Sequence, residues 1–397
     1  MTGKKFKQRK TDVIQNGIVY RMQNKTYGVY TYTDDLPEKV IIPDKIGHIP
    51  VTFLHTKCFF HSGCREVILP NTIEVIKSDA FRFCENLEEI SIPNTIKEVQ
   101  SGAFKRCDKL KQTLFSHGLY IGNAENPYLI LRTNTKEYPK NLVVEVHPKT
   151  KFILDTVFTP CRENGSVGFA EVKNIQKLIL HDHLIFIDDN AFSTSWVPMY
   201  IPTLCIDSIE WLCKSKVKLP GRLQENFIVD GKETNGTLTI PSTVTDIPYG
   251  CFRGYHFIKK VCFEGNISTI GSYAFAKCKN LKEIHFPPQI ECIDNSAFSG
   301  CPNLNEVNFY KIEKIANHAF ELDETDYHRP SWNPPKIDPH KAGLNKITFH
   351  NDVGEICDQS FTGNLNLKTI NGLEKAKKIV GDPFGGTPFK KTEPSKQ

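Results

Sequence analysis

A phrase of about 23 residues recurs along this 397-residue chain and limits the folds that the chain can adopt. Each copy keeps an Ala-Phe step and a Cys while most charged residues around them change, as in "LPNTIEVIKSDAFRFC" (69–84), "IPNTIKEVQSGAFKRC" (92–107) and "FPPQIECIDNSAFSGC" (286–301). Self-similarity at this period is typical of a solenoid, in which one repeat cannot bury its apolar edge without a neighbour. The repeat therefore predicts a stack of coils with a continuous interior.

The copy that ends at Phe104 indicates how one coil is built. Residues 87–92 read L-x-x-I-x-I, and the alternation in their last part is typical of a half-buried strand. Pro93 ends this strand because it lacks a backbone donor, and residues 96–99 predict a second short extended piece. Ala103 allows close approach at the corner, which the Phe104 ring fills. We expect later coils to repeat this design.

Aligning the copies on the Ala-Phe step assigns one corner phenylalanine to each coil. The predicted corner residues are Phe59, Phe81, Phe104, Phe158, Phe192, Phe252, Phe275, Phe298, Phe320, Phe361 and Phe384.

The pattern LxxIxIPxxIxxIxxxAFxxC, reproduced closely at 87–107 and 281–301, resembles the BspA-like leucine-rich repeat family. Recognisable copies run from about Val40 to Phe384, and the stretches 16–43, 119–131 and 226–241 also resemble pieces common in that family. The resemblance implies a leucine-rich-repeat solenoid of the α/β horseshoe class, strand-rich with short helical turns at the Ala-Phe corners. It also implies a role in adhesion or protein binding, and no catalytic residues.

The repeat also suggests how the chain is organised. We expect a basic disordered tail at 1–11, a solenoid at 12–388 and a polar tail at 389–397. The solenoid should be continuous, with irregular segments near 111–150, 193–237 and 321–343, where the rhythm fails.

The net charge of +5 lies mainly in the tails, since residues 1–10 alone carry five Lys and Arg. A nucleic-acid binder carries its basic stripe on the folded surface, so this distribution argues against nucleic acid as a partner. No apolar run approaches the roughly 20 residues of a membrane helix, so we expect no membrane span. The basic start lacks the apolar stretch of a secretory signal. As written, the sequence predicts a cytoplasmic protein; a removed N-terminal signal would place it at the cell surface or outside the cell.

Thirteen cysteines are many, but their spacing does not indicate a metal site. Cys84 and Cys107 lie 23 residues apart, as do Cys278 and Cys301, whereas zinc sites use close pairs such as CxxC, which do not occur here. We predict free thiols that fill equivalent positions of successive coils.

The sequence contains no HExxH, GxSxG, Walker or GxGxxG motif, and we therefore predict no enzyme activity, catalytic residues, cofactor or metal. His181, Asp182 and His183 could suggest a metal pair, but they fall between Leu180 and Leu184, where a turn is expected.

Two features favour a binding function over a purely structural one. Residues of the first strand that point outward form columns of varied charge, and the insertion 321–343 adds aromatic and basic side chains. A wide polar face on a repeated frame suits protein recognition, and long ordered insertions are commonly functional. The expected partner is a protein or a cell-surface ligand, and the alternative is a structural spacer without a specific ligand. The candidate binding residues are Tyr327, Arg329, Trp332, Lys282, His285, Glu283, Glu88 and Glu89.

Overall fold

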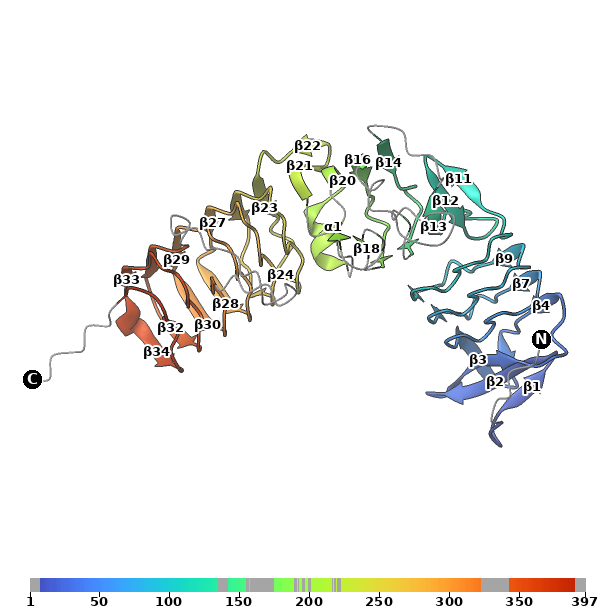
Figure 1. The fold of residues 1–397 in the computed structure, drawn as a ribbon. Coiled ribbons are helices and arrows are strands. Elements are labelled where there is room, and N and C mark those ends of the chain that lie inside the picture. The colour runs from blue at the N-terminus through green and yellow to red at the C-terminus, as the bar shows by residue number, and fades with distance from the viewer. Residues whose placement is uncertain are drawn as a thin grey trace, which may run out of the picture. The chain divides into compact units, whose positions relative to one another are not determined.

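The computed structural model consists almost entirely of short strands and turns (Figure 1). It falls into two compact units, unit 1 (residues 1–199) and unit 2 (residues 200–397), each a strand-rich β-solenoid. The described residues are 8–134, 142–154, 157, 175–188, 191, 193–194, 197–198, 201–215, 217, 219, 223–322 and 343–389.

Unit 1 begins with an antiparallel sheet of β1 (Val13–Gln15), β2 (Ile18–Gln23) and β3 (Thr26–Tyr32). Two rows of short parallel strands follow, one strand of each row per coil. Row A contains β4 (Lys39–Ile41), β7 (Glu66–Ile68) and β9 (Glu89–Ser91). Row B continues from β3 through β6 (Ile49–Leu54), β8 (Val75–Ile76) and β10 (Glu98–Val99), and β5 (Lys45–Ile46) pairs with β6.

The second half of unit 1 departs from this plan. An antiparallel set, β11 (Thr113–Phe115), β12 (Gly118–Ile121) and β13 (Ile130–Asn134), continues by parallel pairing to β15 (Phe152–Ile153) and β17 (Phe186–Ile187). The remaining pairs are β14 (Leu142–Glu145) with β16 (Ile175–Ile179), and β18 (Ser193–Thr194) with β19 (Val197–Pro198).

Unit 2 opens with β20 (Ile201–Ile206), the short helix α1 (Ile209–Lys214), β21 (Leu223–Val229) and β22 (Lys232–Glu233). Its row A contains β23 (Thr237–Ile240), β25 (Lys260–Phe263), β27 (Glu283–His285), β29 (Glu306–Phe309), β31 (Lys346–Phe349) and β33 (Thr369–Asn371). Its row B contains β24 (Asp246–Ile247), β26 (Thr269–Ile270), β28 (Gln289–Ile293), β30 (Lys311–Ile315), β32 (Val353–Ile356) and β34 (Ala376–Ile379), and the turn η2 (Leu373–Lys375) precedes β34.

The strand pattern confirms the predicted coil. In β27, Ile284 is buried while Glu283 and His285 are exposed, and the same alternation recurs in β29. Ile90 of β9 differs, because it is only half-buried. It belongs to the last strand of its sheet, so no further row-A strand covers it.

The corner phenylalanines form two stacked ladders inside the units. Rings of successive coils are nearly parallel, with centroids 5.1 Å apart for Phe59 and Phe81 and 5.2 Å apart for Phe275 and Phe298. The ladder of unit 2 runs from Phe252 to Phe384. The predicted corner residues at positions 158 and 192 lie outside the described residues. The rings from Phe59 to Phe104 and from Phe252 to Phe361 are buried, and Phe384 at the end of its ladder is half-buried, so both ladders remove aromatic surface from water.

The backbone at each corner alternates between two kinds of hydrogen bond. The Phe81 N–H donates to the Ala103 carbonyl of the next coil (2.8 Å), whereas the Arg82 N–H donates to the Asp79 carbonyl of its own turn (3.1 Å). The residues two positions before and two after the corner Phe commonly have positive φ. They are Lys57, His61, Asp79, Phe83, Gly102, Arg106, Gly250, Gly254, Tyr273, Lys277, Ser296, Gly300, His318, Gln359, Gly363 and Gly386.

The recurring cysteine three residues after the corner has a defined role in joining coils. The Cys107 thiol donates to the carbonyl of Phe81 in the preceding coil (3.0 Å), and the Cys301 thiol donates to that of Phe275 (3.2 Å). Burial raises the pKa of Cys301 to about 12, which keeps this thiol protonated as a donor. Every cysteine that the structure describes is a free thiol.

Candidate functional site

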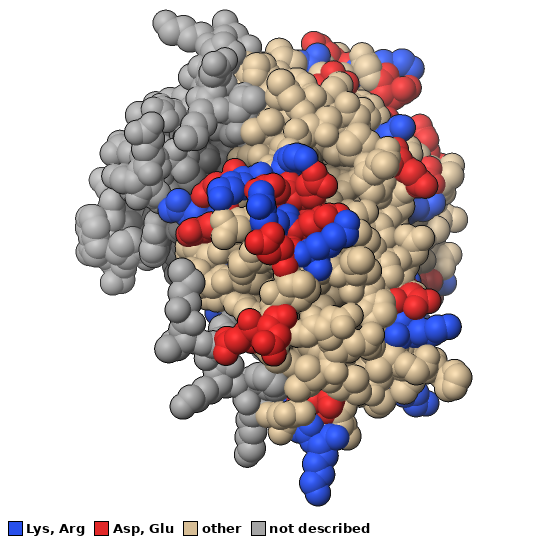
Figure 2. Space-filling model, turned by 90° about the vertical axis from the view of Figure 1, so that its right-hand side faces the viewer, with Lys and Arg blue, Asp and Glu red and all other residues tan. Residues whose placement is uncertain are grey.

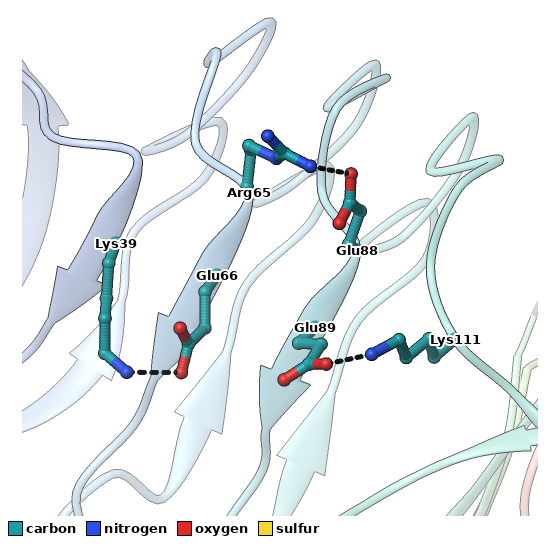
Figure 3. Close-up of polar contacts among 6 residues, drawn as sticks. All are labelled: Lys39, Arg65, Glu66, Glu88, Glu89 and Lys111. Atoms are coloured by element: carbon teal, nitrogen blue, oxygen red, sulfur yellow. Dashed lines mark hydrogen bonds and ion pairs between the residues drawn. The ribbon is translucent and has the colours of Figure 1, made fainter.

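The charged columns of row A in unit 1 are ion pairs between neighbouring coils. Lys39 pairs with Glu66 (2.8 Å), and Arg65 pairs with Glu88 (2.7 Å) (Figure 3). Glu89 accepts a hydrogen bond from Lys111 of the following coil, which lowers the pKa of that carboxyl below its usual value. Two predicted binding residues, Glu88 and Glu89, are therefore already paired within the chain.

This pairing removes any large field of one sign from the face. Figure 2 shows a central cluster in which basic and acidic side chains are mixed, with further charged side chains of both signs elsewhere on this face. Exposed ion pairs contribute little to stability, because water screens them and two long side chains must be ordered. To bind one of these carboxylates, a partner would have to displace the Lys or Arg side chain that already pairs with it.

Row A of unit 2 is less completely paired. Glu283 lies 3.1 Å from the Lys260 ammonium and 3.7 Å from the His285 ring nitrogen, so one carboxylate serves two bases. Lys282 is exposed, and no ion pair joins it to another described residue. Three of the predicted binding residues, Lys282, Glu283 and His285, thus lie together on and beside β27.

A shallow polar hollow lies further along the same row. It is lined by Asn345, Lys346, Asn366, Lys368 and Thr369, at the starts of β31 and β33. Lys346 also faces Glu306 of β29 at 3.9 Å. This hollow extends the polar face of row A beyond β27 but brings no nucleophile or catalytic base together.

Sequence reasoning missed a second surface, on row B of unit 1. Gly28 of β3 lacks a side chain, and the Phe53 ring covers it so closely that an added Cβ would lie 2.1 Å from a ring carbon. The Arg21 guanidinium lies 3.4 Å from the centre of the Tyr30 ring, which in turn packs edge-on against the His55 ring at 5.3 Å. Aromatic and basic side chains therefore alternate across the outward face of β2, β3 and β6.

The aromatic group continues around the neighbouring corner. The His61 ring stacks on the Phe83 ring at 4.7 Å, and the Phe60 ring meets both edge-on. Further cations lie over these rings, with Lys57 at 5.6 Å from Phe60 and Arg82 at 5.0 Å from Phe83. The whole set is called the aromatic–cation surface below and comprises Arg21, Tyr30, Phe53, His55, Lys57, Phe60, His61, Lys77, Arg82 and Phe83.

A spacing signal in the sequence could have found this surface. Phe53, His55 and Lys77 occupy the outward positions beside the buried Leu54 and Ile76, which pair across β6 and β8. A repeat alignment extended to those positions places them in neighbouring coils.

The other predicted site residues have different outcomes. Tyr327, Arg329 and Trp332 lie outside the described residues. His181, Asp182 and His183 lie in a turn, as predicted; the His183 ring nitrogen lies 2.9 Å from the Asp182 carboxylate, and the His181 ring 3.5 Å from Glu145. Among the described residues no group of three or more His, Cys, Asp or Glu could hold a metal ion, and no helix is long and apolar enough to cross a membrane.

Comparison with protein-family models confirms the predicted leucine-rich repeats. The model described as "BspA type Leucine rich repeat region" matches six copies, over residues 30–125, 231–325 and 340–396, which is more than half of the chain. The chain belongs to this family. No curated protein sequence matches it.

Three solved structures align with more than nine-tenths of this chain. A leucine-rich cell surface protein of Faecalibacterium prausnitzii is 16% identical and aligns over 92% of this chain and 95% of its own, with a TM-score of 0.35. A leucine-rich repeat protein of Bacteroides ovatus is 18% identical over 94% and 92%, with a TM-score of 0.32. The pneumococcal vaccine antigen PcpA is 14% identical over 96% and 99%, with a TM-score of 0.36.

Proposed function

We propose that this BspA-type repeat protein is a non-enzymatic binding protein that recognises another protein or a cell-surface ligand. The contact surface in this proposal is row A of unit 2 together with the inserted segment 321–343. The observation that carries the proposal is the incomplete pairing at β27, where Lys282 is exposed without an ion pair among the described residues and Glu283 serves both Lys260 and His285. A partner can contact these groups without first breaking a full set of internal ion pairs.

The position of the insertion supports the same proposal. Phe320 and Phe361 are 41 residues apart in the sequence, yet their rings stack at 5.2 Å, as in adjacent coils. The Phe320 N–H also donates to the Ser360 carbonyl at 2.7 Å. Phe320 and Phe361 stack without the extra residues between them, so a role of the insertion in binding is compatible with the stack.

The alternative function is a structural spacer. The paired row A of unit 1 favours it there, because ion pairs between coils satisfy most of the charges that a partner would use.

A capture experiment with the full chain separates the two functions. The bait is the whole protein, and the variants are a Gly-Ser linker in place of residues 323–340, and Lys282→Glu with His285→Ala. Binding through row A and the insertion predicts that one dominant partner is captured by the wild type and weakened by either change, while the far-UV spectrum and melting midpoint stay the same.

The matched control is Lys39→Glu with Glu66→Lys, which reverses an ion pair on row A of unit 1. It should leave capture unchanged. Capture of no dominant partner, or equal capture by all variants, would contradict the proposal and favour the spacer.

A further inference from the structure

The aromatic–cation surface of unit 1 has a local excess of positive charge. Two of its cations are neutralised within the chain, since Arg21 pairs with Asp12 at 2.7 Å and Arg82 with Asp79 at 3.3 Å. The described residues provide no such acid for Lys57 or Lys77, whose ammonium groups lie over the Phe60 and Phe53 rings. Two ammonium groups are therefore held over aromatic rings without a carboxylate.

Three residues of this surface have a backbone conformation that is unfavourable for residues other than glycine. Lys57, His61 and Phe83 have φ values of 59°, 60° and 62°, in the left-handed region that favours glycine. A bulky residue such as Phe is rare there, and strain of this kind tends to persist where a side chain has a function. Here the strained positions are those that bring His61 and Phe83 into their stack.

We propose that the aromatic–cation surface binds an extended acidic polypeptide segment, with carboxylates at Lys57 and Lys77 and apolar side chains against the exposed ring edges. This deepens the proposed protein-binding function, on which it rests, and assigns a second contact surface with a partner of defined chemistry.

The arrangement of the cations selects this class of partner over two others. A sugar ring stacks on an open aromatic face, but a cation already lies over Tyr30, Phe53, Phe60 and Phe83. A nucleic acid needs many unpaired cations to neutralise its phosphates, and this surface offers two. Acidic side chains on a flexible backbone need only two well-placed cations, and aromatic residues are enriched in protein interfaces.

The state of His55 fits a locally positive surface. Burial lowers the pKa of His55, and the nearby Lys77 and Arg21 lower it further. The imidazole is therefore held neutral near pH 7, so the cations that a carboxylate meets here are Lys57 and Lys77.

The test uses fluorescence anisotropy on the full chain with a labelled peptide of alternating Glu and Phe. A length of about 12 residues reaches roughly 40 Å when extended and so spans several coils. The comparison probes are the same peptide with Gln in place of Glu, a sulfated oligosaccharide and a single-stranded oligonucleotide. We expect the Glu peptide to bind at low salt, more weakly at high salt, and the Gln peptide to bind about tenfold more weakly or worse.

The charge-reversal variant is Lys57→Glu with Lys77→Glu, and its milder form is Lys57→Gln with Lys77→Gln. The matched control is Lys232→Glu with Lys279→Glu, which makes the same charge change at exposed positions of unit 2. Affinity for the Glu peptide should fall about tenfold or more in the reversal variant and less in the Gln variant, with little change in the control.

Three outcomes would overturn the proposal: no binding of the Glu peptide, an equal loss in the control variant, or tighter binding of the oligosaccharide or oligonucleotide through the same lysines. Failure here is distinguishable from failure of the proposed function, because the Lys57 and Lys77 changes leave row A of unit 2 intact. A partner captured equally by wild type and by Lys57→Glu with Lys77→Glu would count against this surface and leave the row-A function standing.

Discussion

The corners of unit 1 and unit 2 have the same interior but different left-handed residues. In both units the corner rings stack with nearly parallel planes, as Phe59 does on Phe81 and Phe275 on Phe298. Two residues after the corner, unit 2 mostly uses glycine at φ near 60–80°, whereas unit 1 uses His61, Phe83 and Arg106. The coil requires a positive φ at this position, and in unit 1 residues with side chains adopt it in spite of the conformational strain.

The difference shows which positions serve the fold and which serve the surface. Glycine at these positions removes the strain, so a non-glycine residue indicates another requirement. In unit 1 that requirement is visible as the stack of His61 on Phe83. In unit 2 the exposed residue Lys277 has a positive φ at the same place, between coils that have Gly254 and Gly300 there.

The largest expected effect tests the shared interior. Phe298→Ala removes a ring that is 1% exposed and should cost about 3–5 kcal/mol in the free energy of unfolding. Since coils interact mainly with their neighbours, hydrogen exchange should rise near residues 275–330 and little in unit 1.

Phe81→Ala is the matched change in unit 1 and should loosen the coils of Phe59 and Phe104 instead. Uniform loosening of the whole chain by either variant would contradict a solenoid with local coupling.

An intermediate effect tests the thiol that joins the coils. Cys301→Ala removes one of two donors to the Phe275 carbonyl, which still accepts from the Cys278 N–H at 3.3 Å, and should cost about 0.5–1.5 kcal/mol, measured by chemical denaturation. Cys301→Ser keeps a donor at this position and should cost less. The corner of Phe361 already uses a different donor, because the Asn364 amide donates to the Phe320 carbonyl at 2.8 Å. Equal costs for Ala and Ser would show that sulfur packing, rather than hydrogen bonding, explains the cysteine.

The smallest expected effect tests the difference between the two units in the left-handed residues after the corner. Lys277→Gly should stabilise the protein by about 0.5–1 kcal/mol, since relief of left-handed strain of about 1–2 kcal/mol exceeds the extra chain entropy of glycine. Phe83→Gly relieves the same strain but loses ring stacking worth about 0.5–1.5 kcal/mol, so it should give no gain. The midpoint of chemical denaturation measures the change in stability of both variants. A clear gain for Phe83→Gly would remove the argument that unit 1 retains strain for its surface.

Much of the fold could be predicted from the repeat. The family could be recognised because the repeat motif resembles it. Periodicity and turn chemistry predict the two strands per coil, the corner phenylalanines that the structure describes and the turn at His181–His183. The candidate binding site stays a prediction, and the structure shows only how its described residues are arranged. Lys282, Glu283 and His285 do lie together on one face, but Glu88 and Glu89 form ion pairs with neighbouring coils, which a strand pattern read one coil at a time does not show.

The sequence by itself determined the period, the inward residues and the corner of each coil, because the buried apolar positions recur at the same place in each repeat. Only the tertiary structure decided which outward side chains meet across coils, such as Arg65 with Glu88 or Phe53 over Gly28. It also decided which residues adopt positive φ, since the chain must close each corner while its N–H groups alternate between two coils. The physical reason is that these features depend on residues about 23 positions apart being held at the spacing of parallel strands, which no local pattern specifies.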